Sequence, residues 1–203
     1  MRGGIQVKLN PIVHEMMKKN NNHITTSQFL SLGYSKTLLG KYVKAGLLER
    51  CNRGVYILPE TLHDDMYTLM LKSKWIVFSH DTALFLNGLS DRTPFTHSVT
   101  IPSNAALSES LRMDCICFYV KPMFYEIGLS KRRTTFGNDV RCYNAERTIC
   151  DLLRSRSRCD EETVISAVKN YMNYKDKDLN LLSVYANQFK VNNELRKYME
   201  VLL

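Results

Sequence analysis

Residues 25–58 limit the fold of this chain more than any other stretch, because two short amphipathic segments and a broken apolar run follow one another there. Thr25 or Thr26 can cap a short helix that Gly33 ends. Ser35 can cap a second helix, which ends at Gly46. The stretch therefore predicts two helices joined by a tight turn.

The elements around these two helices complete a small domain. The sequence predicts an earlier helix over 11–19 and two short strands, 47–50 and 54–58, around a turn at 51–54. Three helices followed by a hairpin are the element order of a winged helix-turn-helix. We therefore expect such a DNA-binding domain over residues 1–59.

The third predicted helix separates its residues by face. Its apolar stripe holds Leu38, Leu39, Tyr42 and Val43, and its polar stripe holds Thr37, Gly40, Lys41 and Lys44. Gly40 costs about 1 kcal/mol relative to alanine inside a helix, and core packing cannot explain it on the polar side. A missing side chain there would let the helix backbone approach a phosphate or a base edge. DNA binding is the favoured interpretation, and a solvated helix face is the alternative.

Charge is distributed unevenly along the chain, whose formal net charge is +8. Residues 1–59 hold nine Lys and Arg against two acids, whereas residues 60–203 are nearly neutral. A basic segment beside a neutral one is typical of a domain that binds a polyanion. The candidate DNA-binding residues on the third helix and the hairpin are Ser35, Lys36, Thr37, Lys41, Lys44, Arg50, Asn52 and Arg53.

The second domain is expected over residues 60–203. Apolar and alternating runs predict strands near 75–78, 97–101 and 113–120, and a hairpin over 131–143 that turns at Gly137-Asn138. Helical patterns fill the chain from Asn144 onward. The fold class is therefore α+β: a winged helix-turn-helix followed by a mixed α/β domain with a helical C-terminal end.

No pattern in the chain predicts catalysis, a metal or a cofactor. Ser79, His80 and Asp81 are the residue types of a hydrolytic triad, but adjacent residues on a regular helix point in different directions and cannot form its hydrogen-bonded relay. Ser79 is expected instead to cap a helix, with Asp81 favoured by the helix dipole. The chain lacks a phosphate-binding glycine loop and paired Cys/His spacings. We therefore expect no enzyme, no cofactor and no metal site.

The cysteines and the apolar runs indicate the compartment. The six cysteines include no CxxC pair, although Cys115 and Cys117 would share one face of a strand, and they are expected to be reduced and mostly buried, with metal binding or disulfides as the alternatives. No apolar run approaches the roughly 20 residues of a membrane helix, and residues 1–10 lack the apolar core of a secretory signal. These features predict a cytoplasmic protein without membrane contact.

Two further groups of charged residues lie in the second domain. Arg147 and Asp151 are spaced i, i+4 and are expected to form an ion pair on a helix face. A secondary basic surface, either for DNA or for an acidic partner, is suggested by Lys131, Arg132, Arg133, Arg154, Arg156 and Arg158. The alternative is ordinary loop charge, and the sequence does not show whether the two triplets meet.

The chain resembles the AbiEi-type antitoxins, which are the transcriptional-regulator half of abortive-infection type IV toxin–antitoxin systems. In the first domain the likeness rests on ITTSQFLSLGYSKTLLGKYVKAGLLERCNRGVYILPE. In the second it rests on FSHDTALFLNGLSDRTPFTHSVTIP, FGNDVRCYNAERTICDLL and the closing KYMEVLL. The first stretch is shared with many winged helices, and its pairing with the others in this order makes the resemblance specific.

The resemblance implies a function for each domain. The first domain would bind inverted repeats of double-stranded DNA in the promoter of its own operon and repress it, as a monomer in solution or a cooperative pair on DNA. The second would help DNA binding and would serve antitoxicity against a nucleotidyltransferase-like toxin, with which the antitoxin need not form a stable complex. The chain lacks the Gly-Ser plus Asp-x-Asp pattern of the toxin itself. The alternatives are a single-component regulator whose second domain senses a ligand, and an enzyme that modifies the toxin.

Overall fold

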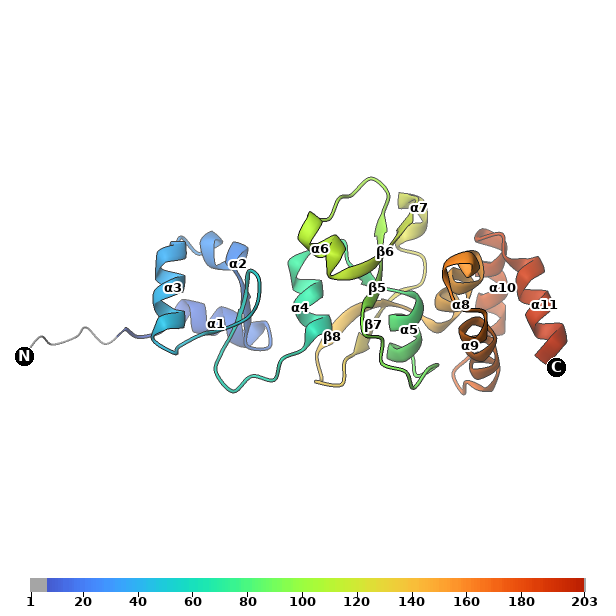
Figure 1. Ribbon diagram of the computed structural model, residues 1–203, viewed down its shortest axis with the longest axis horizontal. Helices are drawn as coiled ribbons and strands as arrows, with labels where there is room; N and C mark the ends of the chain where they lie inside the picture. Colours follow the sequence, from blue (N-terminus) through green and yellow to red (C-terminus); the bar gives the residue numbers. More distant parts are fainter. Residues whose placement is uncertain (1–6, 203) are drawn as a thin grey trace, which may run out of the picture. The chain divides into compact units, whose positions relative to one another are not determined.

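The computed structural model describes residues 7–202, and the chain divides into two compact units, Met1–Lys74 and Trp75–Leu203 (Figure 1). The first six residues and Leu203, which ends the closing segment of the resemblance, lie outside the described residues. Both units combine helices and strands, so the predicted mixed α+β composition is confirmed. Among residues 7–202 no helix is long and apolar enough to cross a membrane.

The first unit combines helices with one small sheet. Its elements are α1 (Pro11–Lys19), β1 (His23–Thr25), α2 (Thr26–Ser31), α3 (Lys36–Lys44), β2 (Glu49–Asn52), β3 (Val55–Ile57) and α4 (Asp65–Lys72). The three strands form an antiparallel sheet in the order β1-β3-β2. The helix expected over 11–19 is present with those bounds, whereas β2 begins two residues later than the strand expected at 47–50.

The helix ends of the first unit follow from local hydrogen bonds. Asn10 accepts a hydrogen bond from the amide of Ile12 at 2.9 Å and begins α1. Thr25 and Gln28 form a reciprocal capping box at the start of α2, so each satisfies an amide that the helix leaves free. The apolar faces of these helices meet over the sheet in a core that includes Val13, Met17, Ile24, Phe29, Leu39, Tyr42 and Leu48.

Helix α4 belongs to the compact first unit, although its residues fall after the predicted boundary at 59/60. It packs against β3, and the Tyr67 ring meets the His23 ring edge-on with centroids 5.0 Å apart. Strand β1, which supplies His23, was not predicted because three residues are too few to show an alternating pattern. The first unit therefore continues beyond Pro59 as far as Lys74.

The second unit is built on a five-stranded mixed sheet in the order β6-β5-β4-β8-β7. The strands are β4 (Val77–Phe78), β5 (His97–Pro102), β6 (Cys115–Val120), β7 (Leu129–Arg133) and β8 (Asp139–Tyr143). Pairs β5/β6 and β4/β8 are parallel, and the other neighbours are antiparallel. Helices α5 (His80–Leu86), α6 (Glu109–Met113) and α7 (Pro122–Tyr125) connect the strands. Strand β6 places Cys115 and Cys117 on one face, with their sulfur atoms 3.5 Å apart.

The helical end of the second unit packs around one central helix, α8 (Ala145–Arg154). Nine of its ten residues are buried, including the charged Glu146, Arg147 and Asp151. The surrounding elements are the short 3-10 helix η1 (Arg156–Arg158) and helices α9 (Glu161–Asn173), α10 (Leu179–Gln188) and α11 (Asn192–Leu202). The predicted helical C-terminal end is present, and α8 is a core element of which only Arg154 is exposed.

Candidate nucleic-acid interface

Helix α3 begins where the sequence indicated. The Ser35 hydroxyl accepts a hydrogen bond from the Leu38 amide at 3.3 Å, and the helix starts at Lys36. The Tyr42 hydroxyl accepts a hydrogen bond from the Asn10 amide at 3.2 Å and so joins α3 to the start of α1. The Tyr42 ring also meets Phe29 edge-on, with centroids 6.1 Å apart. These contacts fix the rotation of α3 about its axis.

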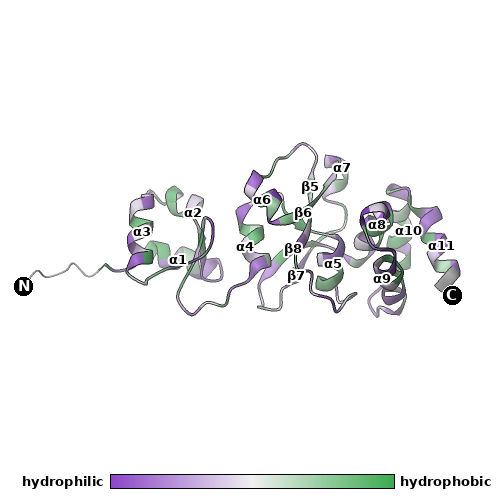
Figure 2. Ribbon diagram, in the orientation of Figure 1, coloured by the Kyte–Doolittle hydropathy of each residue, from purple (hydrophilic) through white to green (hydrophobic). Residues whose placement is uncertain are grey.

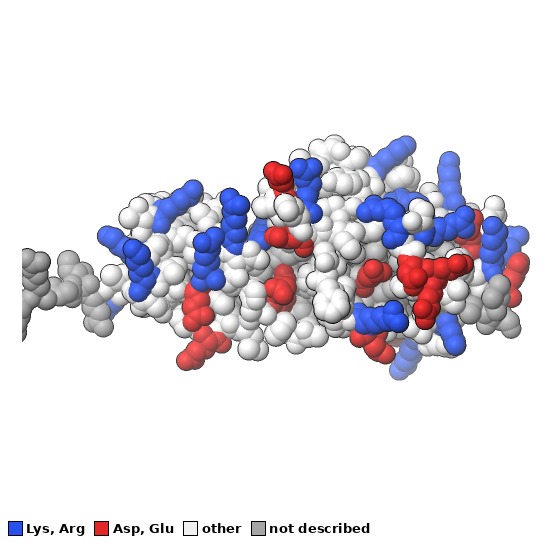
Figure 3. Space-filling model, in the orientation of Figure 1, with Lys and Arg blue, Asp and Glu red and all other residues white. Residues whose placement is uncertain are grey.

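The two faces of α3 have opposite environments. Leu39 and Tyr42 are buried in the core, whereas Lys36, Thr37, Gly40, Lys41 and Lys44 are exposed. Figure 2 shows hydrophobic and hydrophilic colouring on this one helix, and Figure 3 shows Lys and Arg side chains over it. Among residues 7–202 none of the three lysines forms an ion pair. Their charges are therefore available to an external anion.

Gly40 lies on the exposed face of α3, beside open space. A Cβ atom built at this position would meet no heavy atom within 4 Å. The protein's own packing therefore does not require a glycine here, and the residue weakens the helix without a compensating contact inside the chain. The bare backbone at this point is open to an external molecule.

The β2–β3 hairpin, residues 49–57, lies beside α2. The Thr26 amide donates to the Gly54 carbonyl at 2.8 Å, and Gly54 has a φ of +77°, which glycine adopts without strain. The pairing register shifts between Arg50 and Asn52, so the hairpin carries a bulge at its tip. Arg50 and Arg53 are exposed, whereas Asn52 is half-buried.

Asn52 differs from the other predicted contact residues. Its side-chain oxygen accepts hydrogen bonds from the Arg53 amide at 2.6 Å and from the Lys72 ammonium at 2.9 Å. The structure thus places seven of the eight predicted residues on the exposed surface of the first unit: Ser35, Lys36, Thr37, Lys41, Lys44, Arg50 and Arg53. Lys72 was not predicted, and its position next to the hairpin follows from the packing of α4.

The secondary basic residues do not form one surface along the sheet. Lys131, Arg132 and Arg133 belong to β7, at one edge. Arg158 lies against β6 at the opposite edge, where its guanidinium donates to the Cys117 carbonyl at 3.3 Å. Arg158 is therefore separated from β7 by the width of the sheet.

Most of these arginines already have partners in the chain. Arg132 donates to the Asn87 side chain at 2.8 Å, Arg133 lies 3.6 Å from Asp139, and Arg156 pairs with Glu194. The Arg158 guanidinium stacks 4.2 Å from the centre of the Phe118 ring. These contacts favour a structural role for the group, and a role in binding DNA or an acidic partner stays a prediction.

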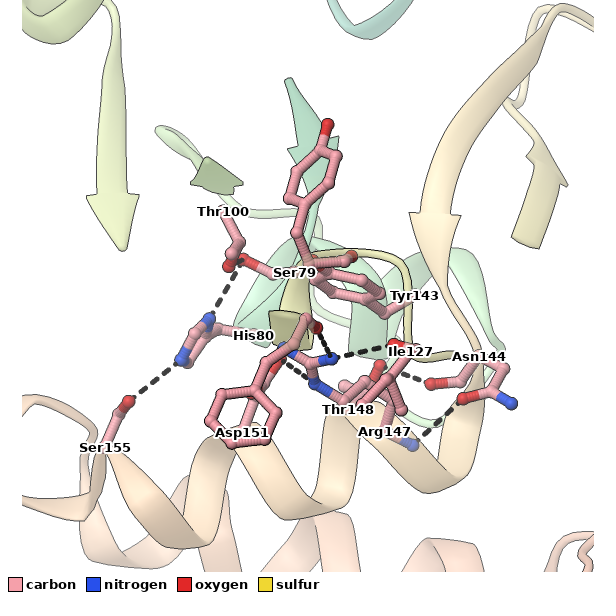
Figure 4. A network of polar contacts seen from close by, with 12 residues as sticks. Ser79, His80, Thr100, Ile127, Tyr143, Asn144, Arg147, Thr148, Asp151 and Ser155 are labelled. Carbon is pink, nitrogen blue, oxygen red and sulfur yellow. Dashed lines mark hydrogen bonds and ion pairs between the residues drawn. The ribbon is translucent and has the colours of Figure 1, made fainter. Parts of the chain in front are cut away.

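Arg147 and Asp151 form the ion pair expected from their i, i+4 spacing, and the pair is buried (Figure 4). The exposed fractions of the two side chains are 0% and 1%, and Nε of Arg147 lies 3.0 Å from Oδ2 of Asp151. Arg147 also donates to the carbonyls of Phe124 and Ile127, both at 2.7 Å. Burial raises the pKa of Asp151, and the adjacent guanidinium opposes that rise.

The Arg147 side chain is closely packed against two aromatic rings and the backbone of Gly128. Its guanidinium carbon lies 4.2 Å from the centre of the Tyr143 ring and 4.1 Å from that of Phe189. A Cβ atom at Gly128, where φ is +74°, would lie 2.5 Å from the Cβ of Arg147. The Arg147 guanidinium therefore has a structural role: it contacts α7, the loop that follows α7, strand β8 and the residue after α10.

The Ser79-His80-Asp81 sequence also differs from its prediction. The Ser79 hydroxyl makes no capping hydrogen bond to α5; it accepts from Thr100 at 2.9 Å and lies 3.0 Å from Nδ1 of His80. Neighbouring side chains meet because His80 has a φ of +47°, outside the regular helix that the prediction assumed. Nε2 of His80 reaches the Ser155 hydroxyl at 3.1 Å (Figure 4).

This hydroxyl–imidazole pair is closed to solvent. Ser79 and His80 have exposed fractions of 0% and 1%, and Asp81 is exposed and takes no part. Burial, together with the positive charges of Arg154, Arg147 and Arg158, holds the pKa of His80 well below its usual range. The arrangement is a neutral core histidine stacked on Phe118, with ring centres 3.4 Å apart.

A groove in the second unit lies between the loop over 88–96 and helix α9. Two adjoining pockets of about 410 and 230 Å³ share Leu84, Ser90, Arg92 and Thr163 in their walls. Asn170 donates to the Leu89 carbonyl at 2.9 Å and ties the loop to α9. The groove also receives the carboxylates of Asp81, Asp91 and Glu162, none of which forms an ion pair within the described residues. Among residues 7–202 no three His, Cys, Asp or Glu side chains converge to hold a metal ion.

Comparison with known proteins identifies the first part of the chain. Residues 7–95 match the family described as transcriptional regulator, AbiEi antitoxin N-terminal domain. The predicted resemblance is thus confirmed over these residues, and after residue 95 it stays a prediction. No curated protein matches the sequence. The structure is similar to that of the RV2827C protein from Mycobacterium tuberculosis, with a TM-score of 0.52, 11% identity and coverage of 78% of this chain and 73% of the other. At this identity the likeness concerns the fold alone.

Proposed function

We propose, from the premise that residues 7–95 carry an AbiEi antitoxin N-terminal domain, that the protein is a DNA-binding repressor of its own operon. It would act as the antitoxin of a type IV toxin–antitoxin system. The observation that carries this proposal is the exposed face of α3, which holds unpaired lysines around a glycine that no internal contact requires. Such a face suits close approach to a polyanion.

The first unit would bind DNA as a winged helix-turn-helix. Helix α3 enters the major groove, which is wide enough to admit a helix. The β2–β3 hairpin follows the backbone or enters the adjacent minor groove. Thr37 and Lys41, in the middle of the exposed face, are proposed to contact base edges, each good contact deciding about 1–3 kcal/mol of specificity.

The remaining cations would position the unit on phosphates. Lys36, Lys44, Arg50 and Arg53 surround the proposed base-reading residues and are exposed. Each phosphate contact releases counterions, so the affinity falls steeply as salt rises. Ser35 contributes indirectly by capping α3, which fixes the helix start and leaves the first amides directed toward the DNA.

Two copies on an inverted repeat would occupy the promoter and block transcription. The proposed partner is a nucleotidyltransferase-like toxin encoded in the same operon, which the antitoxin neutralises without needing a stable complex. The second unit is proposed to serve this antitoxicity. Its buried α8 gives it a rigid core, and its surface carries both the groove beside α9 and the exposed Arg154.

The primary experiment measures binding of the full chain to its own upstream DNA across a salt series, against a scrambled duplex. Sequence-preferring, salt-steep binding is the expected result. The double variant Lys41→Ala with Arg53→Ala should weaken binding at moderate salt at least tenfold. The control Lys175→Ala with Arg196→Ala removes two exposed charges from the second unit and should change the affinity less than twofold. Equal affinity of the wild type for both duplexes would overturn the repressor proposal.

A separate experiment tests the antitoxin role. The adjacent toxin gene is expressed from an unrelated promoter, so that repression by this protein cannot lower its synthesis. The wild type and the Lys41→Ala, Arg53→Ala variant should both restore growth, because α3 and the hairpin are proposed for DNA only. Growth arrest in the presence of the wild type would overturn the antitoxin role and leave the repressor role standing.

A second candidate function is supported by the groove between the 88–96 loop and α9. Pockets of this size accept small molecules, and three unpaired carboxylates against the one guanidinium of Arg92 would favour a cationic ligand. In this case the protein is a single-component regulator whose second unit senses a ligand. The test adds a mixture of cationic metabolites to the DNA-binding assay. A change of DNA affinity in the wild type, and not in a Glu162→Gln variant, would support this function. An operon without a toxin gene would favour it further.

A further inference from the structure

Helix α4 holds the tip of the β2–β3 hairpin through one charged side chain. The Lys72 ammonium donates to Oδ1 of Asn52 at 2.9 Å, and the same oxygen accepts from the Arg53 amide at 2.6 Å. Asn52 follows the register shift that begins at Arg50, so this oxygen lies where the strand pairing is irregular. A single side-chain oxygen thus connects the last turn of α4 with the backbone of the hairpin tip.

The contact is part of a row along α4. One turn earlier, the Thr68 hydroxyl lies 3.9 Å from the sulfur of Cys51, the residue before Asn52. Beside it the Tyr67 ring meets His23 on β1. Helix α4 therefore lies along the three-stranded sheet, with Lys72 at the end nearest to the hairpin tip. Lys72 is half-buried, which limits the motion of its side chain.

We propose that Asn52 and Lys72 form a brace that holds the hairpin tip in the conformation that binds DNA. The inference rests on the proposed repressor function. In it, Asn52 and Lys72 are positioning residues, and Arg50 and Arg53 make the contacts. A tip that is fixed before binding does not lose freedom on binding, so the brace raises the affinity without touching DNA.

The geometry argues against Asn52 as a reader of bases. An asparagine that recognises adenine uses its oxygen and its nitrogen together, as acceptor and donor. In this structure the oxygen already accepts two hydrogen bonds within the protein. Reading a base would require breaking the bond to a charged donor, which is costly in a half-buried position. We therefore assign Asn52 an internal role in place of base reading.

The test uses the full chain and its upstream duplex, in four variants: Lys72→Met, Asn52→Ala, the two combined, and Lys72→Arg. Lys72→Met and Asn52→Ala should each weaken binding about tenfold, which corresponds to the loss of a hydrogen bond to a charged group. The combined variant should be no weaker than either single variant, because both remove the same brace. Lys72→Arg keeps a charged donor and should restore most of the affinity.

The salt dependence separates a brace from a direct contact. If Lys72 only holds Asn52, the slope of log affinity against log salt is the same in Lys72→Met and in the wild type. If Lys72 binds a phosphate, the slope falls by about 0.9. The control Lys18→Met removes an exposed lysine from α1 of the same unit and should change the affinity less than twofold. A lower slope for Lys72→Met, or additive losses in the combined variant, would overturn the brace.

The outcome of this test is distinct from that of the proposed function. Wild-type protein that binds both duplexes equally would overturn the repressor, and no role of the brace in specific binding would survive. Wild-type protein that prefers its duplex, together with full affinity in Lys72→Met, would overturn the brace alone. Thermal unfolding of each variant shows whether the unit stays folded under the binding conditions, so that a loss of affinity is not a loss of fold.

Discussion

Helices α3 and α8 have similar lengths and similar numbers of charged residues, but they use their charges in opposite ways. The lysines of α3 are exposed and have no ion pair within the described residues. On α8, Glu146, Arg147 and Asp151 are buried, and each has partners. Charge on a helix therefore does not by itself mark a binding surface; its burial and its pairing decide.

The comparison separates two costs of a charged residue. A buried charge without a partner costs several kcal/mol, so the three buried charged residues of α8, Glu146, Arg147 and Asp151, each need a partner inside the protein. An exposed charge is solvated by water and needs no partner, so α3 can leave its lysines free until an external anion arrives. Substitutions on α8 should consequently change stability, and substitutions on α3 should change binding.

The largest expected effect is on α8. Arg147→Met removes the guanidinium that holds Asp151 and the carbonyls of Phe124 and Ile127. It should lower the free energy of unfolding by about 3–5 kcal/mol, because it leaves a buried carboxylate and two buried carbonyls without their donor. Chemical denaturation monitored through Trp75, the single tryptophan of the chain, in the second unit, measures the change.

Arg154→Met is the matched control, since it removes an arginine from the exposed end of the same helix. We expect a loss below about 1 kcal/mol, because Arg154 is exposed. Equal losses for the two variants would mean that burial of the charge is not what distinguishes Arg147, and the contrast between the two helices would fail.

The converse variant on α3 combines Lys41→Gln and Lys44→Gln. It should weaken binding to the upstream duplex by roughly 10- to 100-fold and lower the salt slope by about one, for the lost phosphate contact of Lys44. The free energy of unfolding should change by less than about 0.5 kcal/mol, since both ammonium groups are exposed and unpaired. A large loss of stability with unchanged binding would mean that the lysines of α3 stabilise the fold and do not bind DNA.

The third prediction concerns acid stability of the second unit. The pKa of His80 is depressed well below its ordinary 6.5 in the folded state, so the folded protein keeps the imidazole neutral while the unfolded chain takes up a proton. The stabilising difference is complete above pH 6.5 and falls by about 1.4 kcal/mol for each pH unit below it. Thermal melts between pH 7.5 and 5 should show this slope.

His80→Asn tests that assignment. Asparagine tolerates the positive φ of this position and does not titrate in the range. The variant is expected to be less stable at neutral pH, because loss of the imidazole ring leaves a gap beside Phe118. Its stability should depend less on pH than that of the wild type. A residual slope is expected from His23 in the first unit, whose pKa burial also lowers. An unchanged slope in His80→Asn would assign the acid sensitivity to other groups.

The sequence predicted α3 well because every determinant of that helix is local. Its cap, its apolar stripe and its exposed lysines lie within ten residues, between Ser35 and Lys44. The exposed hairpin arginines followed from the turn next to Gly54. Burial of one helix face and exposure of the other is what helical periodicity encodes.

Helix α8 and its network could not be predicted in the same way. The spacing of Arg147 and Asp151 is identical for a surface pair and a buried pair. What buries them is distant in sequence: the Phe124 carbonyl is 23 residues away, and Phe189, whose ring covers the Arg147 guanidinium, directly follows α10. The contact between Ser79 and His80 was excluded on regular helix geometry, which the positive φ of His80 does not obey. The contact from Lys72 to Asn52 spans 20 residues and likewise depends on packing.

Gly40→Ala gives the smallest expected effect and the sharpest form of the comparison. Because a Cβ atom at this position meets nothing within 4 Å, alanine should raise the free energy of unfolding by about 1 kcal/mol. If the bare backbone is there to approach DNA, the same methyl group should weaken binding to the upstream duplex by a few-fold to about tenfold. Denaturation and duplex binding measured on one preparation give both numbers. A more stable variant that binds as tightly as the wild type would show that the glycine serves no contact. Opposite signs would show that α3 gives up stability for binding, whereas the buried charges of α8, Glu146, Arg147 and Asp151, serve to hold the fold.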